Sequence, residues 1–158
     1  MTPLLIIISG PPCAGKTTLA RQLEQQHHAL RLTPDEWHIA LFGNDLADPA
    51  HDARHTTVEA LMWGVAARAL ALGTNVILDF GFWARAERDD FRARAARLGA
   101  ACVVHALVLP KAELLARLGA RNAALPPGTF YISPTYMHQW YAIFQPPSAD
   151  ELDTPPQT

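Results

Sequence analysis

The fold is decided by the stretch Gly10-Pro11-Pro12-Cys13-Ala14-Gly15-Lys16-Thr17, which lies between two segments of contrasting pattern. The segment before it, Leu4 to Ser9, is short, branched and apolar, as is typical of a strand buried in a parallel sheet. The segment after it, Lys16 to His28, carries apolar residues at helical spacing. Strand, glycine-rich loop and helix in this order are the context that the pattern G-x-x-x-x-G-K-T requires.

The spacing within this loop has a physical reason. The two glycines let the backbone curl so that its N–H groups face a β-phosphate, and the N-terminus of the next helix adds the positive end of its dipole. Lys16 would then reach the β- and γ-phosphates of ATP, and the Thr17 hydroxyl would bind Mg²⁺. An incidental lysine in a glycine-rich turn is the alternative. The expected nucleotide-binding residues are Gly10, Pro11, Pro12, Cys13, Ala14, Gly15, Lys16, Thr17 and, near the α-phosphate, Thr18.

The composition sets broad limits. The chain has 158 residues, 49% of them apolar, which suits one domain with a single core. Its formal net charge of −2 provides no basic field for nucleic acid or for an anionic membrane. No apolar run is long enough to span a bilayer, and the run Leu4 to Ile8 lacks the basic residues of a signal peptide. With only Cys13 and Cys102, we expect reduced thiols and a cytoplasmic protein with no membrane partner.

The rest of the chain alternates between strand and helix patterns. Strands are expected at residues 4–9, 29–32, 75–80 and 101–109, and helices at 16–28, from 34, from 49 to 72, 84–98, 110–121 and from 134 to about 144. This order predicts a three-layer α/β fold with a parallel sheet. A capping box between Thr33 and Glu36 is expected to start the second helix. We assign residues 1–147 to one domain with a lid at about 122–134, and residues 148–158 to a Pro-rich acidic tail, expected to be partly disordered.

Two carboxylates follow predicted strands. Asp35 comes just after the second strand, and Asp79 ends the third. Ligands bind at the carboxyl ends of the strands in open parallel sheets, so both side chains are expected near Lys16. We interpret Asp35 as the base that accepts or orients a hydroxyl proton, and Asp79 as a Mg²⁺ ligand. The alternatives are an acid placed by the helix dipole for Asp35 and an ordinary turn residue for Asp79.

Two arginines precede the predicted lid. Arg117 and Arg121 are four residues apart and therefore lie on one helix face. We expect both to contact ATP and to neutralise charge on the phosphoryl group during transfer. A solvated helix face is the alternative. The loop that follows could close over the site and exclude water.

Four segments together resemble a known family. They are the loop Gly10–Thr17, Thr33-Pro34-Asp35, Asn75–Trp83 with Asp79 at its centre, and Arg117-x-x-x-Arg121-Asn122. The chain is similar to P-loop kinase-like proteins often called "AAA family ATPases", which are related to chloramphenicol phosphotransferase, zeta toxins and the polynucleotide kinase domain. The resemblance implies that Asp35 is the general base and that Arg117 and Arg121 are lid arginines.

The resemblance also implies the fold of nucleoside monophosphate kinases, with strand order 2-3-1-4-5. The sequence shows no convincing fifth strand, so we expect four strands in the order 2-3-1-4, or five if the tail pairs with the sheet. No second region is present for the machinery of a hexameric ring ATPase, and we do not expect one.

The phosphate acceptor is expected over the carboxyl edge of the sheet. Phe80, Phe82, Trp83 and Trp37 could form its flat walls, and Arg85 and Arg88 could hold a polar group, although packing and a solvated helix face are the preferred interpretations. Arg92, Arg94 and Arg97 are interpreted as a solvated face. His51 and His55 have a spacing that can bind a metal, but without a third ligand we interpret them as surface histidines.

The leading functional hypothesis is an ATP-dependent kinase that acts on a small hydroxylated molecule. The second is a 5′-hydroxyl polynucleotide kinase, which would need a basic groove that the charge does not support. The third, of another class, is a nucleotide-dependent switch or slow ATPase whose partner is a protein. Oligomeric state is left open.

Overall fold

A computed structural model of the chain describes residues 1–152. Its elements run in the order β1 (Leu4–Ser9), α1 (Lys16–His27), β2 (Leu30–Leu32), α2 (Pro34–Phe42), α3 (His51–Ala71), β3 (Val76–Gly81), α4 (Arg85–Arg97), β4 (Ala101–Ala106), α5 (Lys111–Ala124) and α6 (Pro134–Ile143). The predicted elements are all present. Their ends differ from the predicted ones by a few residues, as expected for boundaries drawn from patterns.

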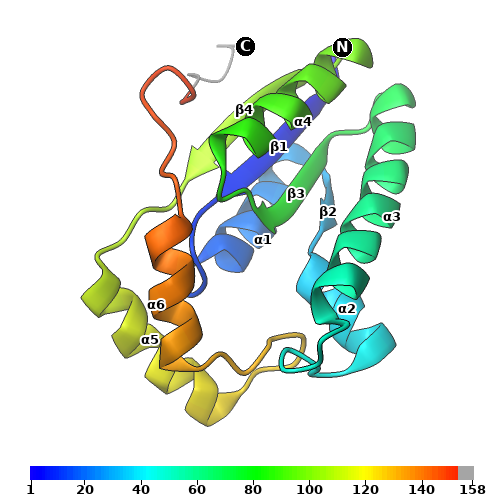
Figure 1. Ribbon diagram of the computed structural model, residues 1–158. Helices are drawn as coiled ribbons and strands as arrows, with labels where there is room; N and C mark the ends of the chain where they lie inside the picture. The colour runs from blue at the N-terminus through cyan, green and yellow to red at the C-terminus, as the bar shows by residue number, and fades with distance from the viewer. Residues whose placement is uncertain (153–158) are drawn as a thin grey trace.

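The four strands form one parallel sheet in the order β2-β3-β1-β4, which confirms the predicted α/β class and strand order. Within residues 1–152 the sheet has no fifth strand. The central strand β1 pairs with β3 on one side and β4 on the other, and its register with β3 shifts between Ile7 and Ser9. All four strands therefore deliver their carboxyl ends to one edge of the sheet (Figure 1).

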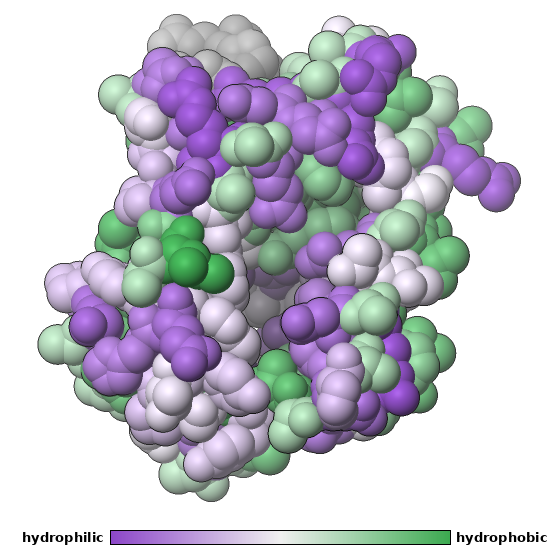
Figure 2. All heavy atoms as spheres, in the orientation of Figure 1, coloured by the Kyte–Doolittle hydropathy of each residue, from purple (hydrophilic) through white to green (hydrophobic). Residues whose placement is uncertain are grey.

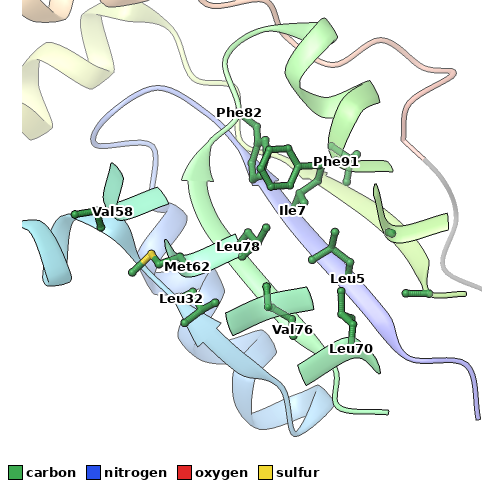
Figure 3. Packing of buried hydrophobic residues seen from close by; sticks show 14 residues of the cluster. Leu5, Ile7, Leu32, Val58, Met62, Leu70, Val76, Leu78, Phe82 and Phe91 are labelled. Carbon is green, nitrogen blue, oxygen red and sulfur yellow. The ribbon is translucent and has the colours of Figure 1, made fainter. Parts of the chain in front are cut away.

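Alternation along the strands builds a core on each face of the sheet. Leu5 and Ile7 of β1 pack with α3 and α4 on one face, where Met62 and Phe91 are buried (Figure 3). Ile6 and Ile8 point the other way and pack with Ala20 and Leu23 of α1. This is the three-layer arrangement, because successive residues of a strand face opposite sides.

A third cluster lies beyond the sheet edge, under the loop that follows β1. Leu114 and Leu118 of α5, Met137 of α6 and Phe130 of the connecting loop are buried there together with Ala14. Ser133 caps α6 by accepting a hydrogen bond from the N–H of Tyr136. The α5–α6 unit is thus packed directly against the glycine-rich loop.

The predicted capping box at the start of α2 is wrong. Thr33 makes no capping hydrogen bond. Its hydroxyl instead donates to Asp79 Oδ2 at 3.2 Å and accepts from Arg31 at 2.5 Å, while Glu36 accepts from the same arginine at 3.0 Å. Thr33 and Glu36 therefore bond to charged side chains and not to the backbone of the helix. Such charge-assisted hydrogen bonds are stronger than a bond to a neutral backbone N–H.

The chain after α6 packs against α4. Arg88, predicted to be packing or solvated surface, is completely buried, and its Nε donates to Glu151 Oε1 at 2.7 Å. Its Nη1 donates to the carbonyls of Phe82 and Gln145, both at 2.9 Å. Arg92, interpreted as solvated face, is half-buried and donates to the carbonyl of Glu151. Residues 148–152 of the predicted tail are therefore placed on the domain, and residues 153–158 lie outside the described part.

In the described part of the chain, no helix combines the length and the apolar character that crossing a membrane would need.

We predict that Glu151→Gln destabilises the protein by about 3 kcal/mol, because it leaves the buried guanidinium of Arg88 without its counter-charge. The bond from Arg88 holds the pKa of Glu151 down at about 2. A carboxyl whose pKa is lower in the folded state stabilises it above its unfolded pKa, so this contribution should disappear as the pH falls from about 4.5 to about 2. Chemical denaturation at several pH values measures both effects.

Asp150→Asn is the matched control, because Asp150 is the neighbouring acid and pairs with Arg85 at 2.6 Å on the exposed surface. Exposed ion pairs contribute little, so this variant should unfold like the wild type. Equal effects of the two substitutions would show that burial of the Arg88 pair is unimportant.

Candidate functional site

The glycine-rich loop connects β1 to α1 and is shaped by its two glycines. At Gly10 an added Cβ would lie 2.7 Å from the carbonyl oxygen of Leu107, so no larger residue fits. Gly15 has a φ of 94°, which glycine adopts without strain. The N–H of Gly10 donates to the carbonyl of Gly81 at 2.9 Å, and this bond fixes the loop to the end of β3.

Lys16 lies inside the site. Its Nζ donates to the carbonyl of Pro11 at 3.0 Å, across the loop. Burial lowers the pKa of Lys16, while the carboxylates of Asp79 and Asp35 act in the opposite direction. Because this ammonium group is shielded from water, its electrostatic attraction to an incoming polyanion is stronger than it would be on the surface.

Asp79 joins three strand ends. Its Oδ2 accepts from the Thr17 hydroxyl at 2.7 Å and from the Thr33 hydroxyl at 3.2 Å, so the start of α1, the residue after β2 and β3 itself meet at one carboxylate. Asp79 is 6% exposed, and burial raises its pKa while Lys16 lowers it. A threonine hydroxyl beside a carboxylate is the set of hard oxygen donors that Mg²⁺ prefers.

Asp35 lies at the first turn of α2, where Pro34 and the N-terminal position favour it. Its carboxylate is open to the cavity and has His55 Nε2 at 3.9 Å from Oδ1. Burial within the cavity raises the pKa of Asp35, against the pull of Lys16 and Arg121. A raised pKa makes this carboxylate a stronger base than an exposed aspartate.

The two arginines of α5 face the glycine-rich loop from the other side. Arg121 Nη1 approaches Cys13 Sγ at 3.6 Å, and its Nη2 donates to the carbonyl of Phe130 at 3.1 Å. Arg117 Nη1 lies 3.5 Å from the carbonyl of Cys13, and its Nη2 donates to Glu113 at 2.8 Å. Arg121 therefore connects the loop to the predicted lid, whereas Arg117 is half-exposed.

These groups surround one cavity of about 580 Å³. Figure 2 shows the hollow near the middle of the face that it depicts, between the side of α5 and α6 and the side of α2 and α3. Of the predicted site residues, those that line it are Pro12, Cys13, Gly15, Lys16, Thr17, Thr18, Asp35, Asp79, Arg117 and Arg121. Residues Pro126 to Phe130 of the predicted lid also line it.

Two of the four aromatic residues that could wall the acceptor region line the cavity, and the other two do not. Phe80 and Trp83 line the cavity, and the indole N–H of Trp83 donates to the carbonyl of Gly10 at 3.1 Å. Phe82 is 1% exposed and belongs to the core, and Trp37 lies outside the cavity. Arg85 pairs with Asp150 at 2.6 Å and, like Arg88, does not line the cavity.

Three histidines, His38, His51 and His55, were expected near the acceptor region, but their grouping around one acid was not predicted. His38 is fully buried, His51 is 7% exposed, and both contact Asp45. The interpretation of His51 as a surface histidine is therefore wrong. His38 and His51 are far apart in sequence, and Asp45 lies in a loop without periodicity, so the only available signal was the number of histidines near α2 and α3.

The sequence matches the model of the AAA domain family AAA_33 over residues 5–129. A comparison with curated proteins finds no match.

Solved structures share the fold. A proposed kinase from Chloroflexus aurantiacus J-10-fl is 20% identical, with a TM-score of 0.74 over 94% of this chain and 83% of that one. A chain of the Pnkp1/Rnl/Hen1 RNA repair complex is 21% identical, with a TM-score of 0.70 over 98% of this chain and 50% of that one. A gluconokinase from Sinorhizobium meliloti 1021 is 16% identical, with a TM-score of 0.66 over 94% of this chain and 78% of that one.

The family match spans the glycine-rich loop, Asp35, Asp79 and both arginines of α5, and the structures related to kinases reproduce the sheet that carries them. The chain therefore belongs to the AAA_33 family of AAA domains and has a P-loop kinase-like fold.

Proposed function

We propose that the protein is an ATP-dependent phosphotransferase that moves the γ-phosphate of ATP to a hydroxyl group of a small molecule. The observation that carries the proposal is that the lysine and threonine of the phosphate loop open into the same cavity as Asp35. A nucleotide switch needs the first two groups, but it has no need of a base with room for an acceptor beside it.

In the proposed reaction, Asp35 accepts the proton of the acceptor hydroxyl. The hydroxyl oxygen forms a bond to the γ-phosphorus, and the bond from that phosphorus to the bridging oxygen breaks with its electron pair leaving on ADP. Lys16 and the N–H groups of the loop balance the negative charge on the phosphates. The raised pKa of Asp35 supports its role, because a stronger base takes the proton more readily.

Arg121 and Arg117 would stabilise the charge that spreads over the transferring group. Their guanidinium groups already face the glycine-rich loop at Cys13. Since Arg121 also holds the carbonyl of Phe130, movement of the lid and placement of this arginine are coupled. Closure would exclude water and so favour transfer over hydrolysis.

Thr17 and Asp79 would hold Mg²⁺, which supplies charge neutralisation at the phosphates when it is bound. The hydroxyl–carboxylate contact of 2.7 Å brings both donors to one point. Thr33 fixes the orientation of Asp79 through its second hydrogen bond, as neighbours of metal ligands commonly do.

A small acceptor is favoured over a polynucleotide. The cavity of about 580 Å³ is of the size that encloses a small molecule. The net charge of −2 offers no basic surface, and Arg85 and Arg88 are engaged by the chain after α6. The likeness to a gluconokinase fits a small hydroxylated acceptor, and the RNA repair structure keeps the 5′-hydroxyl polynucleotide as the second candidate.

A screen with radiolabelled ATP across alcohols, aminoglycosides, nucleosides and 5′-hydroxyl oligonucleotides tests the proposal. We predict label transfer to at least one small alcohol, and none with Lys16→Ala, because that variant loses the cation that reaches the β- and γ-phosphates. Lys111→Ala is the control, since the other lysine lies on α5 near Tyr141, away from the cavity. Binding of a partner protein in one nucleotide state only, without transfer to any acceptor, would establish the switch instead.

Asp35→Asn should keep ATP affinity and lose transfer by about 10²-fold or more, because an amide cannot accept the proton. ATP affinity by calorimetry and label transfer to the acceptor found in the screen separate the two properties. Asp89→Asn serves as control, since Asp89 is an exposed acid of α4. Normal transfer by Asp35→Asn would remove Asp35 from the mechanism.

Asp79→Asn should weaken ATP binding in the presence of Mg²⁺ by about tenfold or more, because it removes a charged oxygen ligand. The same variant should bind ATP in EDTA as well as, or better than, the wild type, since a buried negative charge near the phosphates is gone. Calorimetry with and without Mg²⁺ makes the comparison. A loss of the same size in both conditions would point to a damaged loop and not to a metal ligand.

A further inference from the structure

The histidine cluster, defined here as His38, His51 and His55 with Asp45, forms one wall beside the proposed base. His38 comes from α2, His51 and His55 from α3, and Asp45 from the loop between these helices. Their rings surround Phe130 of the lid, with centroid distances of 5.2, 5.2 and 6.4 Å. The cluster therefore connects α2, α3 and the lid, which lie side by side in Figure 1.

Asp45 determines where the protons of the cluster are. Its carboxylate faces His38 Nε2 at 2.6 Å, His51 Nδ1 at 2.7 Å and Arg54 Nη1 at 2.7 Å. These donors hold the pKa of Asp45 far below its usual value, so the carboxylate is ionised and can only accept. Both histidine nitrogens that face it must therefore carry a proton.

That assignment extends to His55. In the neutral tautomer of His38 that donates from Nε2 to Asp45, Nδ1 is bare, and this Nδ1 faces His55 Nδ1 at 3.1 Å. His55 must then donate from Nδ1, which leaves its Nε2 without a proton. Burial lowers the pKa of His55 to about 4, so the ring is neutral near pH 7.

The bare nitrogen lies beside the proposed base. His55 lines the cavity, and its Nε2 lies 3.9 Å from Asp35 Oδ1 and 3.5 Å from Glu59 Oε1. Among residues 1–152, no arginine or lysine pairs with Asp35 or Glu59. The titratable groups that face His55 from the surrounding elements are Asp35 and His38 of α2, Asp45 of the loop, and His51, Asp52 and Glu59 of α3.

We propose that His55 Nε2 is a specificity-determining subsite that selects acceptors with a second hydrogen-bond donor next to the reacting hydroxyl, namely vicinal diols and amino alcohols. The inference rests on the proposed phosphotransferase function. The reacting hydroxyl donates to Asp35 and its neighbour donates to His55, because donors on adjacent carbons have a separation comparable to that of the two acceptor atoms. A simple alcohol leaves His55 Nε2 without a hydrogen-bond donor. An anionic acceptor is disfavoured because the carboxyl groups of Asp35 and Glu59 lie beside this nitrogen.

Glu59 is the competing donor. Burial, with Glu87 and Asp35 nearby, raises the pKa of Glu59 to about 8, so its protonated carboxyl could supply the proton that His55 Nε2 lacks. The contact of 3.5 Å is longer than a good hydrogen bond, which leaves the nitrogen open to a substrate donor. Glu59→Leu removes this competitor.

A metal ion explains the cluster less well. His38, Asp45 and His51 bring their ligand atoms within 4.8 Å of one another. However, Asp45 already balances the guanidinium of Arg54, and a divalent cation would have to share this carboxylate with that fixed positive charge.

The proton assignment can be tested on the protein alone by ¹⁵N NMR of labelled histidines. We expect His55 in the Nδ1–H form and a return to the commoner Nε2–H form in His38→Phe, where its acceptor is missing. A wild-type His55 in the Nε2–H form would overturn the inference, as would coordination of added Zn²⁺ by His38 and His51. This measurement does not depend on any phosphoryl transfer.

The selection itself can be tested with ATP and two probes, cis-1,2-cyclohexanediol and cyclohexanol. The wild type should phosphorylate the diol with a kcat/KM about tenfold higher, the value of one hydrogen bond whose loss leaves a buried group unpaired. His55→Asn should reduce this ratio to about one, because an asparagine amide replaces the Nδ1–H donor to His38 without supplying the Nε2 acceptor. His138→Asn, which changes an exposed histidine of α6, should leave the ratio unchanged, and so should Glu59→Leu.

Equal rates for the two probes, no transfer to the diol, or an unchanged ratio in His55→Asn would each overturn the selection. Loss of the ratio in Glu59→Leu alone would assign it to Glu59. If transfer to another acceptor still depends on Lys16 in these cases, the phosphotransferase function survives and only the subsite is refuted.

Discussion

The carboxylate of Asp79 ties the site together. It lies near the end of the third strand and accepts hydrogen bonds from Thr17, which follows the first strand, and from Thr33, which follows the second. These three chain segments carry Lys16, Asp35 and Asp79 itself. One buried acid therefore sets the distance between the phosphate loop and the proposed base, and the parallel sheet makes this possible because it delivers all three strand ends to one edge.

The turn after Asp79 needs its own support, because Phe82 has a φ of 47°, a conformation unfavourable for a bulky residue. Two donors hold its carbonyl: the Ser9 hydroxyl at 2.8 Å and Arg88 Nη1 at 2.9 Å. Arg88 is held in turn by Glu151. The last described residues of the chain thus stabilise the strand end that carries the proposed metal ligand, although they do not line the cavity. Because Arg88 is buried and bonded to Glu151 and to the carbonyl of Phe82, it is not available to contact a substrate.

Sequence reasoning was most successful where the signal is local. The glycine-rich loop and the alternation of strand and helix follow from spacing and periodicity, and the structure has them. The strand order was implied by the family resemblance, and the structure has it too. Sequence reasoning was wrong where a side chain forms hydrogen bonds with a residue that is distant in the sequence. The position of Thr33 before a helix predicts a cap, but its hydroxyl donates to Asp79, which is 46 residues away in the sequence. Arg88 resembles a charged surface residue because its partner, Glu151, is 63 residues away in a Pro-rich segment.

The histidine cluster was not predicted for the same reason, because its members come from two helices and the loop between them. Its position beside the proposed base shows how such contacts can affect the chemistry of the site. The phosphate side of the cavity carries the cations Lys16, Arg117 and Arg121, while the opposite side carries Asp35 and His55, with Glu59 behind that histidine. A protonated histidine there would lower the pKa of Asp35 and weaken the proposed base. Burial of the rings keeps His55 neutral, and Asp45, itself balanced by Arg54, fixes which nitrogen is bare. A neutral acceptor beside the base can bind a second substrate donor without reducing the strength of that base, and a lysine or arginine at the same position could not.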